Sequence, residues 1–306
     1  LHREAIQRGG MTLIDEPRAE HLYAAMGPAT VTSGGSAGNT MAGIASFGGR
    51  GAYFGKVRND ELGRLFTHDI KAIGVDFPSR PARNGPSTAR CMIFVTPDGE
   101  RSMNTYLGAC TRLGPADVDK ATVEAAAITY LEGYLWDPPE AKEAFRKASE
   151  IAHAAGRQVA LTLSDSFCVD RYRAEFLDLM RSGVVDIVFA NEAELKSLYT
   201  TGDFDSAVAA IRNDARLAVV TRSELGAMAL TRDETISAPA FPVETLVDTT
   251  GAGDLFAAGF LFGATAEREL RDCLRLGALA AAEVIAHVGP RPQVDLRQLA
   301  IDNGLI

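Results

Sequence analysis

Seven residues in the last fifth of the chain combine an acid, two glycines and the start of an apolar helix. The segment Asp248-Thr-Thr-Gly-Ala-Gly-Asp254 is followed directly by Leu-Phe-Ala-Ala-Gly-Phe-Leu-Phe. Gly251 and Gly253 allow a tight turn in which successive backbone N–H groups point the same way. The N-terminus of the following helix adds unpaired N–H donors and partial positive charge. Together these features predict an anion cradle suited to a phosphate group that is being transferred.

Asp254 closes this segment, where the predicted helix begins. A carboxylate at the mouth of an anion cradle is placed to accept a proton from an attacking hydroxyl group, as a general base does. Asp is also common at helix N-termini, where it only caps the helix. A cap does not account for the segment as a whole, so we favour the catalytic interpretation.

Two other glycine-rich phosphate motifs do not fit the sequence. A Walker loop requires G-x-x-x-x-G-K-[ST], but around Lys56 the leading position is Arg50 and the trailing position is Val57. A dinucleotide fingerprint requires G-x-G-x-x-G, but counted from Gly251 the last position is Phe256. A nicotinamide oxidoreductase therefore ranks far below a phosphate-transferring enzyme.

Composition limits the function classes further. The 306 residues are 46% hydrophobic and 23% charged, with a net charge of −9. These values exclude a disordered or collagen-like chain, and the acidic balance argues against nucleic acid as a general partner. No apolar stretch reaches membrane-spanning length and no signal peptide is visible, so we expect a cytoplasmic protein without a membrane partner. The four cysteines are widely spaced and no His/Cys cluster suggests zinc, which predicts reduced thiols.

Short β-rich runs alternate with alanine-rich helical stretches. The predicted strands are apolar throughout, as is typical of strands covered on both faces, and lie at 128–131, 159–163, 187–190, 218–221 and 227–231. The predicted helices lie at 38–47, 61–73, 138–155, 171–182, 192–199, 205–214, 255–263 and 268–286. Helical crossovers imply parallel pairing, so the chain predicts an open α/β sheet with helices on both sides.

One segment breaks this pattern and predicts a β-hairpin. Residues 87–95 and 101–106 flank the turn sequence Thr96-Pro-Asp-Gly-Glu100, in which Pro fixes φ and Gly accepts a positive φ. Its residues alternate between two different faces, and residues 11–14 are a candidate third strand of the same small sheet. A two-faced hairpin beside an α/β core is a candidate lid, and an ordinary edge hairpin is the alternative.

Residues 248–254 resemble the signature of the PfkB, or ribokinase-like, kinases. A second family signature is similar to Gly34-Gly-Ser-Ala-Gly-Asn39, followed by Gly48-Gly49, Gly55-Lys-Val57 and Asp60, and a third to Asn191-Glu-Ala-Glu194. The resemblance runs from about residue 30 to about residue 290. It implies one ribokinase-like domain over 1–306, with a three-layer α/β/α sandwich around a mostly parallel sheet. Residues of about 10–16 and 87–107 would form the β-sheet lid, which also offers a surface for a homodimer.

The resemblance implies ATP-dependent transfer of the γ-phosphoryl group to a hydroxymethyl oxygen of a small sugar or nucleoside. Asp254 would be the general base, and the N–H groups of Gly251, Ala252 and Gly253, with its own, would hold the developing charge. Asn191 and Glu194 would position Mg²⁺ and phosphate, with Glu194 reaching the metal through water. From the residues alone, these two would instead be a capped helix start.

Further ATP-side residues follow from the same resemblance. Thr221-Arg-Ser-Glu-Leu-Gly226 is similar to the family's T-x-G-x-x-G nucleotide loop, so Thr221 and Gly226 would approach ATP, but Ser223 replaces the first glycine. Thr249 also falls on the ATP side. Ala278, Ala282 and residues 284–289 resemble the adenine-side wall, although tight packing of an alanine-rich helix explains them equally well. A K⁺ requirement stays open.

On the acceptor side, the resemblance assigns the substrate-binding residues Gly34, Gly35, Asn39, Asn104, Glu132 and Tyr134. The lid run from Arg101 is similar to bacterial adenosine-kinase-like members, and nearby aromatic side chains suit a base, so we favour adenosine. Glu132 is reminiscent of sugar-specific members, which makes a sugar kinase the alternative. The family begins with a strand whose Asp binds the acceptor, and nothing before Met11 matches it. A nucleotide-binding protein without turnover is therefore a further alternative.

Overall fold

A computed structural model describes residues 1–97 and 100–306, so Asp98 and Gly99 of the predicted hairpin turn lie outside the described residues. Its main sheet has six strands in the order β4-β5-β6-β7-β8-β9. They span Ile128–Glu132, Gln158–Thr162, Ile187–Asn191, Leu217–Thr221, Ala227–Leu230 and Thr235–Ala238. The pairs from β4 to β7 are parallel, which confirms the α/β fold with a mostly parallel sheet.

The far edge of this sheet differs from the prediction. β8 pairs with β7 in the antiparallel sense, and the unpredicted β9 pairs antiparallel with β8. Only residues 222–226 connect β7 to β8, and a parallel crossover needs a dozen residues or more. The short connection therefore forces a hairpin. Among the described residues, no segment before β4 joins the main sheet.

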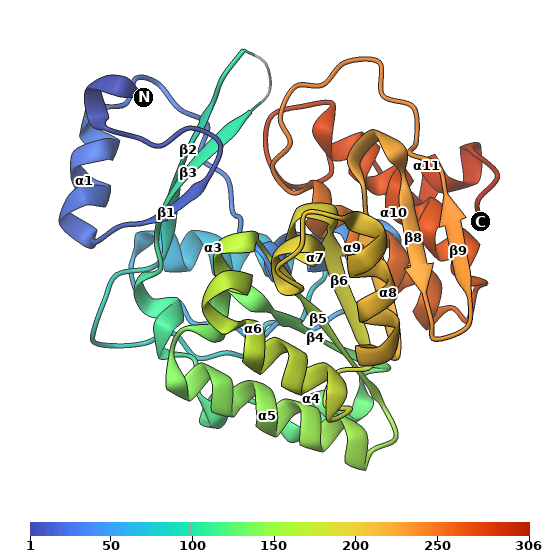
Figure 1. Cartoon of the computed structure of the whole chain (residues 1–306). Helices are drawn as coiled ribbons and strands as arrows, with labels where there is room; N and C mark the ends of the chain where they lie inside the picture. The colour runs from blue at the N-terminus through green and yellow to red at the C-terminus, as the bar shows by residue number, and fades with distance from the viewer. Residues whose placement is uncertain (98–99) are drawn as a thin grey trace.

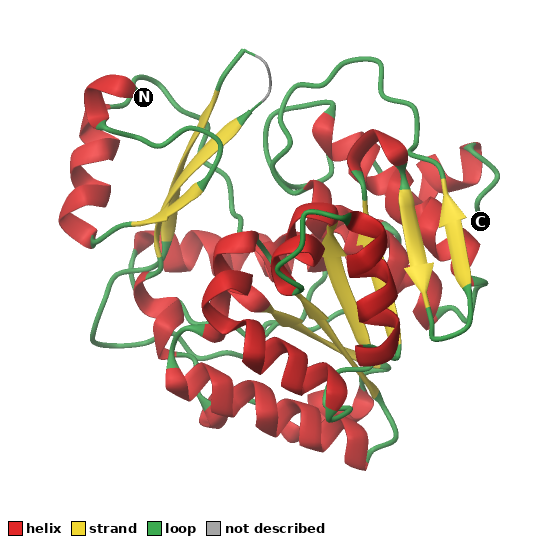
Figure 2. Ribbon diagram, in the orientation of Figure 1, coloured by secondary structure: helices red, strands yellow, loops and turns green. Residues whose placement is uncertain are grey.

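Helices cover both faces of the main sheet (Figure 2). Alternate strand residues such as Leu161 and Val188 pack with α5, α6, α7 and α8, whereas Ala160 and Phe189 pack with α9 and α10. The three layers are thus built by period-two alternation on strands that are buried on both sides. The helices of these layers are α2 (Ser36–Ser46), α5 (Pro139–Ala154), α6 (Ser166–Arg181), α7 (Glu192–Leu198), α8 (Phe204–Asp214), α9 (Ala252–Thr265) and α10 (Leu270–Ile285).

Several smaller elements complete the chain. α3 (Glu61–Ala72), α4 (Lys120–Ala125) and α11 (Leu296–Asp302) lie around the core, and short 3₁₀ turns occur at His2–Glu4, Gly108–Arg112, Pro115–Asp117, Gly133–Trp136 and Ser223–Leu225. α6 begins five residues before its predicted start because Asp165 caps it, and the helix is kinked at Tyr172 (φ −123°, ψ 19°). No described helix is long and apolar enough to cross a membrane, and the four cysteines are free thiols.

The predicted hairpin belongs to a separate three-stranded sheet that stands beside the core (Figure 1). β1 (Met11–Leu13) pairs parallel with β3 (Arg101–Tyr106), and β2 (Arg90–Val95) pairs antiparallel with β3. The unpredicted helix α1 (Glu16–Ala25) packs on one face, where its Ala19 and Leu22 contact Met92 and Phe94. The opposite face of this sheet, the inner face, lies toward the cleft described below.

Candidate active site

The glycine-rich segment forms a helix N-terminus whose amides are open. Gly251 caps α9 with a left-handed backbone (φ 83°), and a Cβ atom there would lie 2.7 Å from the Pro290 carbonyl oxygen. The Ala252 N–H donates to the Thr249 carbonyl at 3.3 Å, but the N–H groups of Gly253 and Asp254 find no acceptor among the described residues. A Cβ added at Gly253 would meet open space. The predicted anion cradle therefore exists, with two free donors beside a void.

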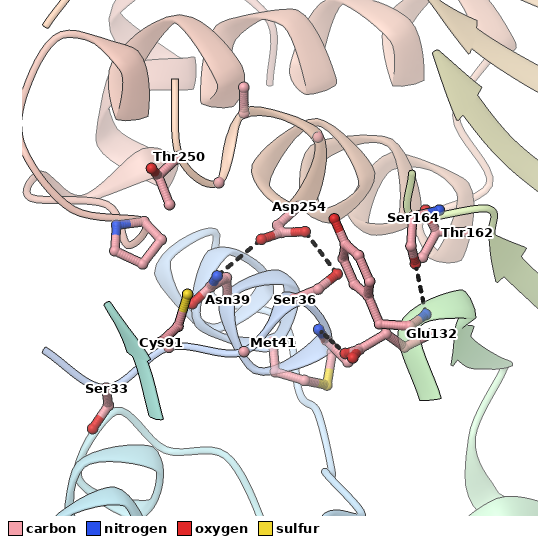
Figure 3. A pocket seen from close by; sticks show the side chains of 18 of the residues that line it. Ser33, Ser36, Asn39, Met41, Cys91, Glu132, Thr162, Ser164, Thr250 and Asp254 are labelled. Atoms are coloured by element: carbon pink, nitrogen blue, oxygen red, sulfur yellow. Dashed lines mark hydrogen bonds between the residues drawn. The ribbon is translucent and has the colours of Figure 1, made fainter. Parts of the chain in front are cut away.

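Asp254 faces this void from the first turn of α9, held by two residues of α2 (Figure 3). The Ser36 hydroxyl donates to its Oδ1 at 2.8 Å, and the Asn39 amide donates to its Oδ2 at 2.8 Å. Burial raises the pKa of Asp254, while the hydrogen bonds from Asn39 and Ser36 act in the opposite direction. The carboxylate is thus oriented by two donors and is made more basic than an exposed Asp, as a proton acceptor requires.

A second carboxylate lies near Asp254, at the end of β4. Glu132 accepts a hydrogen bond from the Ala37 N–H at 2.7 Å, at the start of α2. Burial raises the pKa of Glu132 to about 7, and the negative charge of Asp254 adds to that rise. Gly133 follows it because a Cβ atom there would lie 2.6 Å from the Thr162 carbonyl oxygen on β5. Glu132 is therefore fixed between the sheet and the α2 turn.

A cleft of about 3110 Å³ runs between the lid sheet and the carboxyl ends of the parallel strands. Single-ligand sites commonly occupy roughly 300–1,000 Å³, so this cleft has room for two ligands. All but one of the predicted site residues line it: Gly34, Gly35, Asn39, Glu132, Tyr134, Asn191, Glu194, Thr221, Gly226, Thr249, Gly251, Ala252, Gly253, Asp254, Ala278 and Ala282.

Asn104 is the exception, and its role as a substrate contact stays a prediction. It does not line the cleft. Burial on β3 alternates so that Ser102 and Asn104 lie on the face covered by α1, and Asn104 pairs in register with Met92 of that same face. Strand alternation reveals two faces, but it does not tell which face turns toward the site.

Arg101 is the lid residue that the sequence prediction missed. It lies on the inner face, and its guanidinium Nη1 donates to the Thr249 carbonyl oxygen at 3.1 Å and to Thr249 Oγ1 at 3.2 Å. The Arg101 charge also lowers the pKa of Asp254. The signal was present in the sequence, because Arg101 is three residues before Asn104 on a strand and so lies on the opposite face. The lid thereby brings a cation to the edge of the anion cradle.

Asn191 and Glu194 form the capping box that the residues alone suggested. Asn191 Oδ1 accepts from the Glu194 N–H at 2.8 Å, while the Glu194 carboxylate accepts from the Asn191 N–H at 2.9 Å and from its side-chain amide at 2.6 Å. Glu194 is 5% exposed, and burial raises its pKa to about 7. Among the described residues, no group of three or more His, Cys, Asp or Glu side chains is placed to hold a metal ion.

The nucleotide-loop residues are explained partly by packing. A Cβ atom at Gly226 would lie 2.2 Å from the Ala238 carbonyl oxygen of β9, so a glycine is needed there whether or not a ligand binds. Ser223, where the family pattern has a glycine, has a left-handed backbone (φ 49°). The conformation that favours glycine is therefore retained although the residue has changed.

Two further signature residues have structural roles. Asp60 caps α3 through the Gly63 N–H at 2.8 Å and accepts from the Thr88 N–H, also at 2.8 Å, which joins α3 to the base of the lid. Lys56 forms an ion pair with Asp117. These residues support the site without contacting Asp254.

Comparison with known proteins agrees with this geometry. The model of the pfkB family carbohydrate kinases matches residues 19–296. The structure of a probable sugar kinase from Rhizobium etli is 58% identical, has a TM-score of 0.98, and is matched over 100% of this chain and 93% of that one. The adenosine kinase structure from Sinorhizobium meliloti is 59% identical, with a TM-score of 0.97 and coverage of 99% and 93%.

A curated relative, the ATP-dependent ribose-1-phosphate kinase of Halopiger xanaduensis, is 29% identical over 292 residues, which are 89% of this chain and 90% of that protein. The family match includes β2 and β3 of the lid together with the α9 cradle. This chain belongs to the PfkB family of carbohydrate kinases, which transfer a phosphoryl group from ATP to an alcohol.

Proposed function

We propose that this kinase phosphorylates the hydroxymethyl oxygen of adenosine or of a closely related purine nucleoside, with ATP as donor. The name of the S. meliloti relative, 59% identical, supports this acceptor class. The observation that carries the proposal within this chain is the composition of the inner face of the lid.

Apolar side chains cover the inner face in register. Met103 of β3 lies between Met11 of β1 and Ile93 of β2, and all three line the cleft. Leu13 of β1 lines it beside them. Aliphatic and thioether groups form good contacts with a flat aromatic base, whereas these four side chains offer no hydrogen bond to the hydroxyl groups of a free sugar. A nucleoside would place its base against the lid and its hydroxymethyl group toward Asp254.

Asp254 would accept the proton of the attacking hydroxyl group as its oxygen bonds to the γ-phosphorus atom. The bond from that phosphorus atom to the oxygen it shares with the β-phosphate would break, and ADP would leave. The free N–H groups of Gly253 and Asp254 would hold the charge on the phosphoryl oxygens. Arg101 would move from Thr249 to the phosphates when the nucleotide binds, because the two lie at the same edge of the cradle. The buried Oδ1 atom of Asn39 has no described partner. It would accept a hydrogen bond from a hydroxyl group of the nucleoside.

The cleft also fits ATP and Mg²⁺, which PfkB kinases use. Thr221, Thr249, Ala278 and Ala282 line its nucleotide side. Both oxygens of Glu194 already accept from Asn191, so Glu194 suits a metal ion that keeps its water shell rather than a direct bond. Mg²⁺ would neutralise phosphate charge, and this chain's residues would orient its waters.

A sugar acceptor is the second candidate, and Glu132 favours it. Its carboxylate lies near Asp254 and the start of α2, where it could accept hydrogen bonds from a hydroxyl-rich ligand. A lid-mediated homodimer is a separate proposal. Because α1 already covers the outer face, such a dimer would have to use an edge strand or the inner face, and sedimentation of the chain tests it.

An ADP-release assay separates the acceptors. The chain is incubated with ATP and Mg²⁺ and with adenosine, inosine, ribose or fructose, each with and without K⁺. We expect adenosine to give the highest kcat/KM. Faster turnover of a free sugar would replace the nucleoside proposal by the sugar one, and ATP binding without any acceptor-dependent ADP release would indicate a nucleotide-binding protein without turnover.

A further inference from the structure

The segment that leads to Gly34 and Gly35, here called the acceptor turn, is held by few hydrogen bonds. Residues 27–34 connect α1 to α2, and none of their backbone N–H groups donates to a described acceptor. Residues 27–32 are exposed, and Ser33 is the first buried one, at 8% exposure. Immediately after it come Gly34 and Gly35, which line the cleft. The position of the turn must therefore depend on contacts made at its ends.

Ser33 makes the contact at the near end. Its hydroxyl group donates to Asp69 Oδ2 on α3 at 2.6 Å, and this is the one described hydrogen bond that ties residues 27–34 to another element. Figure 3 shows Ser33 on this segment, apart from the cluster around Asp254. The neighbour of Asp69 on the helix, Ile70, is fully buried among Val57, Val75 and Phe77. The carboxylate is thus carried by a helix that is itself anchored.

Hydrogen bonds and, to a smaller extent, nearby positive charge lower the pKa of Asp69. The hydrogen bond from Ser33 is the largest influence that lowers the pKa of Asp69, and the positive charge of Arg291 also lowers it. Arg291 is mostly buried against Phe66, and its Nε and Nη2 atoms have no described partner. Hydrogen bonds to an ionised acceptor are stronger than neutral ones. The Ser33–Asp69 bond is therefore well suited to act as a tether.

The far end of the same turn is held by the active site itself. Ala37 donates to Glu132, while Ser36 and Asn39 donate to Asp254. Residues 33–39 therefore donate hydrogen bonds to three carboxylates on three elements. These are Asp69 on α3, Glu132 on β4 and Asp254 on α9. Two of them lie in the cleft, and Asp69 lies outside it.

We propose that Asp69 is a positioning residue for the acceptor: through the Ser33 hydroxyl group it sets where Gly34 and Gly35 present their backbone to the substrate. This inference rests on the proposed function in one respect, that the turn contacts the acceptor. Asp69 touches neither Asp254 nor the phosphate cradle, so its effect should fall on acceptor binding and not on ATP.

Steady-state kinetics with both substrates varied tests the proposal. We expect Asp69→Ala and Ser33→Ala each to raise the acceptor KM about tenfold, since a hydrogen bond to a charged group is lost. The ATP KM should stay within about twofold. Ser33→Thr keeps the hydroxyl group and should restore most of the affinity, whereas Asp69→Asn keeps only a neutral acceptor oxygen and should restore part of it.

A matched control and a double variant sharpen the result. His68 bonds the other oxygen of Asp69 at 3.2 Å and is exposed, so His68→Ala should leave the acceptor KM unchanged. Ser33→Ala/Asp69→Ala should be no worse than the poorer single variant, because both remove one bond. An unchanged acceptor KM in both single variants, or equal losses for ATP and acceptor, would overturn the proposal.

Hydrogen exchange gives a readout that does not depend on turnover. Mass spectrometry of the acceptor-free protein should show faster amide exchange over residues 33–39 in Asp69→Ala than in the parent or in His68→Ala, with α9 unchanged. Unchanged amide exchange over this segment would contradict the proposed role of the Ser33–Asp69 bond, even if the protein phosphorylated no substrate. Absence of turnover in the parent chain would instead count against the proposed function alone.

Discussion

The two ends of the cleft are held in different ways. At the phosphate end, α9 and α10 touch backbone to backbone, because a Cβ atom at Gly259 would lie 2.4 Å from the Leu276 carbonyl oxygen. Elsewhere side-chain bonds make the connection, from Arg101 of the lid to Thr249 at the edge of the cradle and from Ser33 to Asp69 at the proposed acceptor end. The chemistry is thus built on close-packed helices, which deform little. The proposed acceptor contacts depend instead on side-chain hydrogen bonds.

The largest expected effect lies at the rigid end. Asp254→Asn keeps the shape of the side chain but removes the proton acceptor, so kcat should fall by about 10²–10⁴-fold. ATP affinity, measured by isothermal titration, should change little. Retention of normal turnover would mean that another group takes the proton, with Glu132 the first to test.

Two alanine substitutions in the cradle should affect different properties: Gly251→Ala should lower stability, and Gly253→Ala should lower activity. Gly251→Ala forces a side chain onto a left-handed backbone and against Pro290, which we expect to cost about 2 kcal/mol or more of folding free energy. Gly253→Ala meets no protein atom and replaces a poor helix former, so the unfolding free energy should hold or rise.

The activity of Gly253→Ala should nevertheless fall by roughly a hundredfold, since its methyl group occupies the space beside the free amides. Denaturant unfolding and kcat/KM for ATP measure both properties. A stable Gly251→Ala protein would contradict the close packing of Gly251 against Pro290. A fully active Gly253→Ala protein would contradict the open phosphate site beside Gly253.

Arg101→Gln probes the flexible end. It removes the lid cation but leaves β3 in place, so kcat/KM for ATP should fall about tenfold or more while the midpoint of thermal unfolding stays within a few degrees. Arg101→Lys keeps the charge without the two-pronged geometry and should recover only part of the loss. If Arg101→Gln kept full activity, the contact with Thr249 would be structural only.

Glu132 predicts a pH dependence of stability. The pKa of Glu132 is raised from 4.5 to about 7 by burial, so between these values the folded protein holds a proton that the unfolded chain has released. Its contribution to the free energy of unfolding is therefore full below pH 4.5 and is lost as the pH rises through about 7. Glu132→Gln should flatten this slope in denaturant titrations across the window. An identical slope in both proteins would show that the group titrates normally.

The smallest effect is expected in the nucleotide loop. Ser223 adopts a left-handed backbone that is strained for a residue with a side chain. Ser223→Gly should therefore stabilise the protein by about 0.5–1 kcal/mol, after the greater freedom of glycine in the unfolded chain has offset part of the gain. Thermal unfolding should shift upward by a few degrees at most. Gly226→Ser, its matched opposite, should destabilise, because a Cβ atom there meets Ala238.

Much of the fold could be predicted because its signals are local. Uniformly apolar strands and alanine-rich helices indicate a three-layer sandwich, and the glycine pair before α9 indicates an anion site wherever it lies. β9 was missed because Thr235–Ala238 is short and half exposed. α1 was missed because its apolar residues form only a weak stripe, with Ala19 and Leu22 alone buried.

The site residues that could not be predicted depend on contacts between distant segments. Ser36 lies 218 positions from Asp254, and Ser33 lies 36 positions from Asp69, so no spacing rule connects them. Arg101 and Asn104 lie on opposite faces of β3, and the sequence does not tell which face lies toward the cleft. The packing of α1 on the Asn104 face decides this. Sequence reasoning thus located the motifs, while the tertiary arrangement assigned their partners.

The helix on the outside of the lid has a consequence for the working cycle. Because α1 covers the outer face of β2 and β3, the lid is a slab of two layers, a helix and a sheet, with a small hydrophobic core between them. If this slab moved away from the cleft, it would expose one apolar surface and not two. The apolar side chains between α1 and the sheet would stay out of water in that position.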